Sequence, residues 1–259
     1  MKLIILAAGR GSRLSKYTRD CPKGMLEFAG RSLLKHQIDT FREYGISDIN
    51  IVRGYKKDKI IFDDVKYFDN SDFSNTNMVE SLMCAEKTLN DNCVVTYSDL
   101  ILEKGVVSQV VNSEYDIGVV VDKNFEEYWK LRLGDEYLED MESLVISGDQ
   151  KITSLGKLNP AIEEVHGRYV GAIKFSRKGI ESLIRCYQKH KLRKSLNSMG
   201  NRPFEKWHMT DLLQAIIGDG NIVNPIIISR GWLEFDTDKD YDTYKRWFQE
   251  NSIHRFINL

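Results

Sequence analysis

The chain has 259 residues, 42% of them hydrophobic and 29% charged, which is typical of a globular protein that buries a large core. The formal net charge of −1 argues against a general affinity for nucleic acid or for an anionic membrane surface. No apolar run reaches the roughly 20 residues of a membrane span, and the four cysteines have no paired spacing, so we expect a cytoplasmic protein with reduced thiols.

The first predicted strand is followed by a loop that suits phosphate groups. Residues 3–6 form a short apolar run, as in a buried parallel strand. Small residues and two arginines follow, and Lys23 adds a third cation after Pro22. This combination predicts a cradle for a polyphosphate, formed by Leu6, Ala7, Ala8, Gly9, Arg10, Gly11, Ser12 and Arg13. Leu14 stands where a dinucleotide fingerprint needs its third glycine, and no P-loop pattern is present.

Further along the chain, apolar runs alternate with helical periodicities. The pattern predicts helices over residues 32–44 and 75–90, and strands over 48–52, 65–68, 93–97 and 117–121. Residues 125–158 alternate polar and apolar side chains, which predicts antiparallel hairpins in an insert spanning about 123–170. The remainder predicts strands over 168–175, 222–228 and 232–235, helices over 180–190, 209–217 and 238–249, and a polar loop over 191–207.

This order of elements predicts an α/β fold. We expect a single domain over residues 1–259, with a doubly wound, mostly parallel but mixed sheet of Rossmann-like type. The small antiparallel hairpin insert is expected to lie over the site. In such sheets, ligands bind beyond the carboxyl ends of the strands.

Three carboxylates lie at such strand ends. Asp99 follows the strand at 93–97, and Glu234 and Asp236 point to one face of a late strand. Because Mg²⁺ accompanies nucleoside triphosphates and prefers carboxylate oxygens, we predict that Asp99 and Asp236 bind Mg²⁺, with Glu234 as a third ligand or a neighbour of the ligands. Helix capping is the alternative role for Asp99 and Asp236. A solvated first helical turn is expected at Asp238, Asp240 and Asp242.

These motifs resemble the signature of the sugar-phosphate nucleotidyltransferase superfamily. Its pattern L-A-A-G-x-G-[ST]-R-L, followed by P-K, matches residues 6–14 and 22–23, and its late W-x-E-x-D-T pattern matches residues 232–237. The resemblance implies that an acceptor's phosphate or phosphonate oxygen attacks the α-phosphorus of a nucleoside triphosphate and releases pyrophosphate. Lys23 and Arg13 would be the catalytic cations, and no general base is needed because the attacking oxygen is already ionised.

Within that superfamily, the chain is most similar to the small cytidylyltransferases of the phosphocholine and 2-aminoethylphosphonate type. Such enzymes carry an asparagine-containing segment before a helix with a serine, here Asn75, Asn77 and Ser81. An amide both donates and accepts hydrogen bonds, as a cytosine edge requires, so we expect these residues to bind the nucleotide and CTP to be the substrate. Helix capping is the alternative role of both asparagines.

The acceptor is expected beneath the insert. Trp129, with Tyr128 and Trp207, is a candidate aromatic wall for a quaternary ammonium, and Arg132 is a candidate partner of the acceptor's phosphate or carboxylate. Candidate partners of an amine are Asp140, Glu142, Glu163 and Glu164, and the resemblance adds Gly171. Ordinary packing and solvated turns are the alternatives. Phosphocholine, 2-aminoethylphosphonate and a phospho-amino acid such as phosphoglutamine stay open as acceptors.

Other functions also stay open. A sugar-1-phosphate nucleotidyltransferase would use UTP or dTTP, but the asparagine segment counts against it. A non-catalytic nucleotide-binding regulatory module would be expected to lack Lys23, Asp99 or Asp236, all of which are present. A glycosyltransferase would carry an Asp-x-Asp motif, whereas residues 97–99 contain one acid. The favoured class commonly serves the decoration of bacterial surface polysaccharide, and a monomer and a homodimer are both compatible with it.

Overall fold

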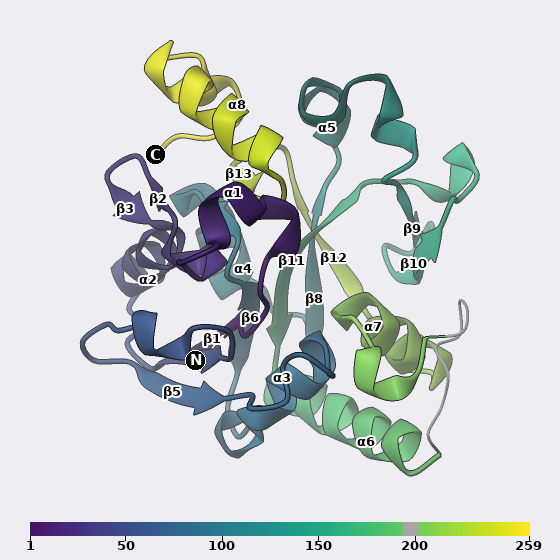
Figure 1. The fold of residues 1–259 in the computed structure, drawn as a ribbon. Helices are drawn as coiled ribbons and strands as arrows, with labels where there is room; N and C mark the ends of the chain where they lie inside the picture. Colours follow the sequence, from purple (N-terminus) through teal and green to yellow (C-terminus); the bar gives the residue numbers. More distant parts are fainter. Residues whose placement is uncertain (194–201) are drawn as a thin grey trace.

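The structure is a computed structural model that describes residues 1–193 and 202–259, and Figure 1 labels its helices and strands. The strands are β1 (Lys2–Ala7), β2 (Glu27–Phe28), β3 (Arg31–Ser32), β4 (Ile49–Arg53), β5 (Lys66–Asp69), β6 (Cys93–Tyr97), β7 (Leu100–Leu102), β8 (Ile117–Asp122), β9 (Glu142–Ile146), β10 (Ile152–Leu158), β11 (Arg168–Phe175), β12 (Asn224–Ile228) and β13 (Trp232–Glu234). The helices are α1 (Ser15–Thr18), α2 (Leu33–Glu43), α3 (Met78–Cys84), α4 (Lys104–Asn112), α5 (Phe125–Leu133), α6 (Arg177–Arg193), α7 (Met209–Gly218) and α8 (Asp238–Gln249).

Seven of the described strands form one sheet, in the order β12-β8-β11-β6-β1-β4-β5. The strand β11 runs antiparallel to β6 and β8, and the other neighbouring pairs in the sheet are parallel. The expected α/β fold with a mostly parallel, mixed sheet is therefore confirmed. Because β1 lies between β4 and β6, the predicted phosphate loop leaves from the interior of the sheet rather than from an edge.

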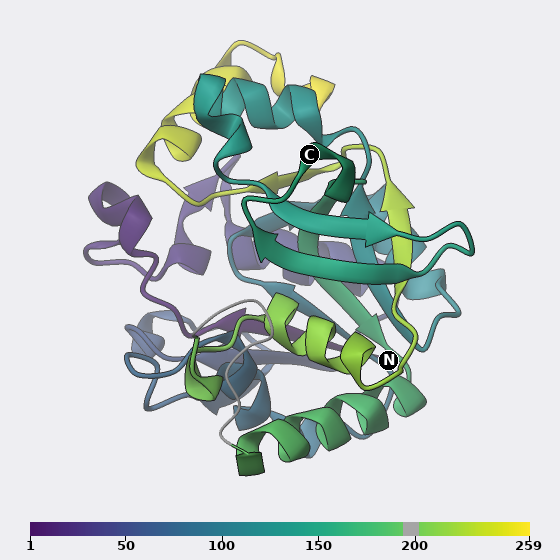
Figure 2. The same cartoon turned by 90° about the vertical axis from the view of Figure 1, so that its right-hand side faces the viewer.

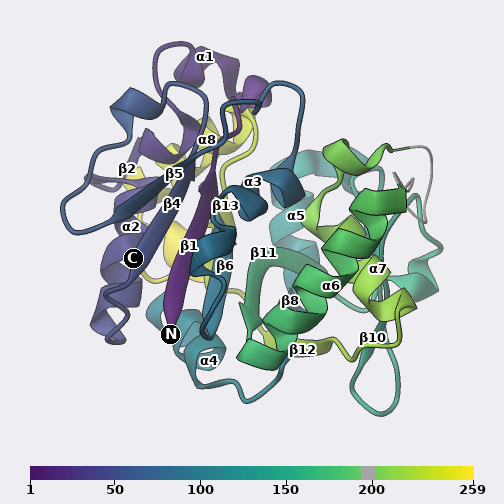
Figure 3. The same ribbon diagram turned by 90° about the horizontal axis from the view of Figure 1, so that it is seen from below.

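The strand β1 is buried on both faces, because its apolar side chains alternate between two cores. Leu3 and Ile5 pack into one core with α2 and α4, whereas Ile4 and Leu6 pack into the other with α3, α6 and α7. Figure 3 shows α2 on one side of the central strands and α3 with α6 on the other. With both faces covered by helices, the open position for a ligand is the end of the strand.

The first part of the predicted insert is a helix, so the prediction of hairpins throughout 125–158 is wrong at its start. Phe125, Tyr128, Trp129 and Arg132 are buried in α5 at intervals of three or four residues, which is the period of a helix rather than of a strand. The strands β9 and β10 do pair as an antiparallel hairpin. Figure 2 shows this hairpin between α5 and α7.

Two other predicted boundaries shift. The helix predicted over 75–90 begins only at Met78, and a 3₁₀ turn, Glu86–Thr88, replaces its last part. The helix α6 continues to Arg193, and residues 194–201 of the predicted polar loop lie outside the described part of the chain. No helix within residues 1–193 and 202–259 is long and apolar enough to cross a membrane. All four cysteines are free.

Candidate active site

A cavity of about 330 Å³ lies at the carboxyl ends of β1 and β6. Its walls come from segments far apart in the sequence, with these lining residues: Leu6, Ala8, Gly9, Gly11, Ser12, Arg13, Lys23, Phe73, Thr76, Asn77, Met78, Ser81, Tyr97, Ser98, Asp99, Glu234 and Asp236. Most of the residues predicted to bind nucleotide or metal are in this set. Ala7, Arg10 and Asn75 are not among them.

The loop after β1 turns at Gly11, which has a left-handed backbone with a φ of 66°. A Cβ atom at this position would lie 3.1 Å from the side chain of Lys23, so glycine lets the loop rest on the alkyl chain of the lysine. The hydroxyl of buried Thr18 lies 3.0 Å from the carbonyl oxygen of Gly11 and 2.9 Å from that of Leu14. The loop backbone and Lys23 are therefore held as one unit.

Lys23 lies between two carboxylates in the cavity. Its Nζ atom is 2.6 Å from Asp99 Oδ2 and 3.0 Å from Asp236 Oδ1. Arg13 donates to the other oxygen of Asp236, at 2.7 Å. In Figure 1 the purple segment after β1 accordingly lies beside the yellow segment that leads into α8.

A short antiparallel ladder brings the two acids together. Leu100 of β7 pairs with Glu234 of β13, and the backbone N–H of Phe235 donates to the carbonyl of Asp99 at 2.9 Å. Asp99 and Asp236 therefore lie side by side just beyond the end of this ladder. This placement explains why two acids on distant strands share one cation, Lys23.

Gln37 holds the turn that carries Asp99. Its side chain is 1% exposed, and its Nε2 donates to the carbonyls of Tyr97 and Leu100, at 2.8 and 2.9 Å, on either side of that turn. Gln37 was not among the predicted site residues. A glutamine inside the apolar stripe of the predicted helix was the available signal, because a buried amide needs partners.

Burial and charge oppose one another at Lys23 and Asp99. Burial alone would lower the pKa of Lys23, but the charges of Asp99 and Asp236 outweigh it and raise that pKa. Burial raises the pKa of Asp99, although Lys23 opposes the shift. The Oδ1 atom of Asp99 is buried and has no hydrogen-bond partner in the described part of the chain. An unpartnered carboxylate oxygen beside a second carboxylate fits a hard divalent cation such as Mg²⁺.

Arg132 lies beneath the acidic cluster, so the prediction that it contacts the acceptor is wrong. Its side chain is 3% exposed, and its guanidinium donates to Glu234 at 2.6 Å and to the two oxygens of Asp240 at 2.7 and 3.0 Å. Burial alone would raise the pKa of Glu234, but the charge of Arg132 holds it well below its usual range. Glu234 lines the cavity, yet it is already engaged in this ion pair.

Asp240 is buried, so the prediction that it belongs to a solvated helical turn is wrong. It is 1% exposed, and its Oδ2 accepts hydrogen bonds from the backbone N–H groups of Asp236 and Thr237, at 3.1 and 2.7 Å. The hydroxyl of Thr237 in turn accepts from the backbone N–H of Asp240, as in a capping box. Asp240 therefore fixes the backbone position of Asp236.

The opposite wall of the cavity is organised by Asn70. This buried side chain donates to the hydroxyls of Thr76 and Ser81, at 2.9 and 3.0 Å. Asn77 lines the cavity and caps α3, because its Oδ1 accepts from the backbone N–H of Met78 at 2.9 Å. Asn75 is exposed and donates to Asp72 instead. The structure thus brings Ser81 and Asn77 to the cavity but not Asn75.

Gly171 makes room for an aromatic wall. Its φ is 84°, and a Cβ atom there would lie 2.6 Å from the ring of Tyr97. Tyr97 lines the cavity, and its hydroxyl lies 2.7 Å from that of Tyr169. Gly171 therefore seats the Tyr97 ring and does not itself line the cavity.

The predicted aromatic wall of the acceptor site is wrong. Trp129, Tyr128 and Trp207 are 0%, 2% and 1% exposed, so they belong to the two cores. The Nε1 atom of Trp129 donates to Asp140 at 3.2 Å, and Arg168 pairs with the same carboxylate at 3.1 Å. Asp140 is therefore already engaged within the insert.

Glu142 differs from the other predicted acids. Its side chain is half-buried, and burial raises its pKa, with Arg168 opposing and Asp140 adding to the shift. Within the described residues, no hydrogen bond or ion pair occupies its carboxylate. By contrast, Glu163 is exposed, and Glu164 pairs with Lys157 at 2.9 Å.

Five cavity residues were not predicted: Phe73, Thr76, Met78, Tyr97 and Ser98. Three of them, Thr76, Met78 and Ser98, are direct sequence neighbours of predicted residues, and Tyr97 lies two residues before Asp99, so their positions followed from the motifs. Phe73 had no such signal. It reaches the cavity because the chain passes close to Gly54, where a Cβ atom would lie 2.8 Å from the Cβ of Phe73.

Residues 3–202, more than half of the chain, match the MobA-like NTP transferase domain. The chain belongs to this family. It is accordingly an enzyme of the nucleotidyltransferase class. Among characterised relatives, it is 31% identical over 253 residues to a CTP:phosphoglutamine cytidylyltransferase of Campylobacter jejuni subsp. jejuni, covering 93% of this chain and 98% of that protein. It is 30% identical to a choline-phosphate cytidylyltransferase of Streptococcus pneumoniae over 141 residues, which are 53% of this chain and 61% of that protein.

Two solved structures superpose on this chain and have the same fold. A CTP:phosphocholine cytidylyltransferase from Streptococcus pneumoniae superposes with a TM-score of 0.71 at 20% identity, covering 95% of this chain and 98% of that one. An inositol-1-phosphate CTP transferase from T. maritima superposes with a TM-score of 0.72 at 18% identity, covering 100% of this chain and 98% of that one.

Proposed function

We propose that this enzyme transfers CMP from CTP to a small phosphorylated acceptor that carries an amino group, of the phosphoglutamine type, and releases pyrophosphate. The observation that carries the proposal is the meeting of Lys23 and Arg13 with Asp99 and Asp236 at the end of β1. Support for the acceptor class comes from similarity to the Campylobacter phosphoglutamine enzyme over 93% of this chain.

The phosphates of CTP would lie on the loop after β1. Gly9, Gly11 and Ser12 line the cavity there, and a Cβ atom at Gly9 would meet no atom within 4 Å, which leaves room for phosphate oxygens. Arg13 lies beside them with a largely exposed side chain. The cytosine would lie against the opposite wall, where Asn77 and Ser81 present polar side-chain atoms. The phosphates and the base would then lie against two separate walls of one cavity.

Magnesium is the cofactor that this donor set favours. Asp99 and Asp236 would hold it, since Asp99 Oδ1 is buried without a partner. When bound, the ion would supply positive charge that neutralises the triphosphate. Glu234 would contribute through the surrounding charge, because Arg132 already pairs with it.

The chemical step needs no general base from the protein. An ionised phosphate oxygen of the acceptor forms a bond to the α-phosphorus of CTP. The bond from that phosphorus to the bridging oxygen breaks, and pyrophosphate leaves with the electron pair. Lys23 would exchange its carboxylate partners for an α-phosphate oxygen and stabilise the charge that develops there.

The aromatic side chains and the insert favour an amine over a quaternary ammonium. The predicted cage for a quaternary ammonium is missing, because Trp129, Tyr128 and Trp207 are buried. Among the lining residues, Tyr97 and Phe73 are the aromatic ones. Glu142 instead offers a half-buried carboxylate without a partner among the described residues. A primary ammonium on the acceptor would satisfy it.

Pyrophosphate release tests this proposal. The purified enzyme with Mg²⁺ would be assayed with CTP, UTP, dTTP and ATP against phosphoglutamine, phosphocholine, 2-aminoethylphosphonate and glucose 1-phosphate. We expect the fastest release with CTP and phosphoglutamine, and loss of that preference among acceptors in Glu142→Gln. Faster release with UTP or dTTP and glucose 1-phosphate would favour a sugar-1-phosphate nucleotidyltransferase. A role in decorating surface polysaccharide would follow from the CDP-linked product and is part of the same proposal.

A further inference from the structure

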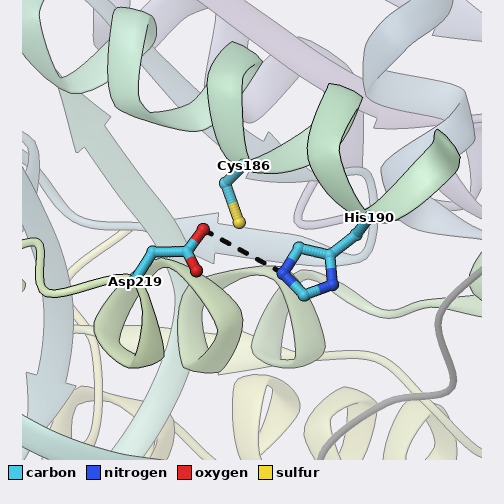
Figure 4. Close-up of side chains that lie close together, drawn as sticks. All are labelled: Cys186, His190 and Asp219. Carbon is cyan, nitrogen blue, oxygen red and sulfur yellow. Dashed lines mark ion pairs between the residues drawn. The ribbon is translucent and has the colours of Figure 1, made fainter. Parts of the chain in front are cut away.

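A second group of metal-binding side chains lies outside the active site, between α6 and α7. Cys186 and His190 lie four residues apart on α6, so both project from one face of that helix. Asp219 follows the last residue of α7. Figure 4 shows the three side chains pointing toward one another, and none of them lines the active-site cavity.

The atoms of this Cys-His-Asp cluster are close enough to share one ion. The Sγ atom of Cys186, a ring nitrogen of His190 and a carboxylate oxygen of Asp219 all lie within 4.8 Å of one another. His190 Nε2 lies 4.0 Å from Asp219 Oδ2. Tetrahedral zinc, with bonds of about 2.0–2.3 Å, sets its ligand atoms roughly 3.3–3.8 Å apart. Small side-chain rotations would therefore close the cluster on an ion.

The imidazole of His190 lacks the partners that a buried ring normally has. Both ring nitrogens are buried, and neither makes a hydrogen bond within residues 1–193 and 202–259. Trp207 packs against the ring, with the two centroids 5.2 Å apart, and so limits its rotation. An unpartnered nitrogen aimed at a thiol and a carboxylate indicates a ligand.

Two neighbouring features prepare the cluster for an ion. Lys189 pairs with Oδ1 of Asp219 and leaves Oδ2 on the side of His190. Such an outer partner commonly orients a carboxylate that binds a metal. A cavity of about 460 Å³ also opens beside Cys186 and Asp219, which provides an entry path and room for a water as fourth ligand.

We propose that Cys186, His190 and Asp219 form a structural Zn²⁺ site that fastens α6 to α7. Zinc accepts thiolate, imidazole and carboxylate ligands together, whereas Mg²⁺ takes oxygen ligands, so this site is distinct in kind from the acidic pair of the active site. On binding, the S–H bond of Cys186 breaks, its proton goes to solvent, and Sγ donates an electron pair to the zinc ion. The thiolate and the carboxylate then balance the two positive charges.

The site would also support the insert through α7. Gln214 of α7 accepts a hydrogen bond from the backbone N–H of Leu155 in β10, at 2.9 Å. Fastening α7 to α6 would therefore hold the helix on which the hairpin rests. None of the three ligands belongs to the phosphate loop or the acidic pair, so the zinc site is independent of the proposed function.

Cobalt binding to the protein tests the site, since tetrahedral Co²⁺ with a thiolate ligand has a characteristic charge-transfer absorption. We expect one such Co²⁺ per chain, displaced by one equivalent of Zn²⁺, and a higher melting temperature with Zn²⁺. Cys186→Ser should abolish the charge-transfer absorption. His190→Gln and Asp219→Asn should each weaken binding by at least the roughly 10- to 100-fold seen for outer-shell losses.

Two controls separate this site from others. Cys84→Ser removes an exposed thiol outside the cluster and should leave the cobalt spectrum unchanged. Asp99→Asn alters the active site and should also keep the thiolate absorption. Absence of that absorption in the wild-type protein, or its persistence in Cys186→Ser, would overturn the proposal. The Co²⁺ titration of the wild-type protein tests the zinc site even where a variant fails to fold.

Discussion

The ammonium of Lys23 lies 2.6 Å from the carboxylate of Asp99, and Asp236 accepts from the same ammonium at 3.0 Å. The lysine thus occupies the space between the two acids that we propose to bind Mg²⁺. A phosphate group would draw Lys23 away and free both carboxylates for the cation. Binding of nucleotide and of metal would then support one another.

Replacing Lys23 should separate these two roles. Lys23→Met is expected to lower kcat by about 10²-fold or more, as for the loss of one preorganised donor. The same variant should bind Mn²⁺ more tightly than the wild type in the absence of nucleotide, because no ammonium competes for Asp99 and Asp236. Steady-state kinetics and Mn²⁺ titration followed by electron paramagnetic resonance measure the two effects.

Lys87→Met is the matched control, since this exposed lysine does not line the cavity. It should leave both kcat and Mn²⁺ affinity unchanged. Wild-type turnover in Lys23→Met would remove the lysine from the mechanism, and unchanged Mn²⁺ affinity would refute the competition.

The buried pairs of Arg132 should matter for stability. Arg132→Met leaves the buried Asp240 and the half-buried Glu234 without their cation, and breaking a buried pair costs about 3–5 kcal/mol of unfolding free energy. Urea denaturation measures this loss. Lys130→Met on the same helix removes the exposed pair with Glu126 and the contact of the ammonium with the ring of Tyr137, and it should leave the urea midpoint nearly unchanged. Equal midpoints for the two variants would contradict the structural role of Arg132.

A methyl group at residue 171 should displace the Tyr97 ring. Gly171→Ala places a Cβ atom 2.6 Å from that ring at a φ of 84°, and we expect a loss of about 1–3 kcal/mol together with a higher KM for CTP. Gly148→Ala meets no atom within 4 Å and serves as the control. If Gly171→Ala matched this control in stability and KM, Tyr97 would not form a fixed wall.

Acidification should destabilise the protein through buried histidines. Burial lowers the pKa of His36 below the 6.5 of the exposed side chain, against the hydrogen bond that its Nε2 donates to Phe28. Below pH 6.5 the unfolded chain therefore binds a proton that the folded chain resists. His36 contributes its full stability above pH 6.5 and loses it as the pH falls.

His36→Gln keeps a donor for the Phe28 carbonyl and removes this titration. Its unfolding free energy should fall less than that of the wild type between pH 7.5 and pH 5.5. His254→Gln, at an exposed histidine, should retain the wild-type slope. Parallel slopes for His36→Gln and the wild type would show that His36 does not carry the effect.

The positions of the loop after β1 and of the acidic pair in one cavity were predictable, because they depend on short, contiguous motifs. Residues 6–14 give the cradle its glycines and cations, and Asp99 and Asp236 each follow a recognisable strand. Their closeness in space then followed from one rule, which is that the carboxyl ends of parallel strands lie at the same edge of the sheet. Lys23 reached the site for the same reason, since it follows the loop by a few residues.

The acceptor region was predicted poorly because its residues depend on tertiary packing. Trp129 and Arg132 share a helix whose apolar residues also fit a strand-like alternation over short windows. Whether Arg132 meets a ligand or Asp240 depends on where α8 packs, and no local pattern encodes that. Asn75 and Asn77 stand two residues apart, yet only Asn77 reaches the cavity, because it is the residue that caps α3.

We propose above all that the enzyme transfers CMP, in this cavity, to a phosphorylated amino compound. Phosphorus-31 nuclear magnetic resonance of a reaction containing CTP, phosphoglutamine and Mg²⁺ tests it most directly. We predict that a pyrophosphate signal and the paired signals of a CDP-linked diester appear in equal amounts with wild-type enzyme, and that neither appears with Asp99→Asn. Bound CTP that yields no diester with any acceptor of the panel, or a diester formed only from UTP or dTTP, would contradict the account.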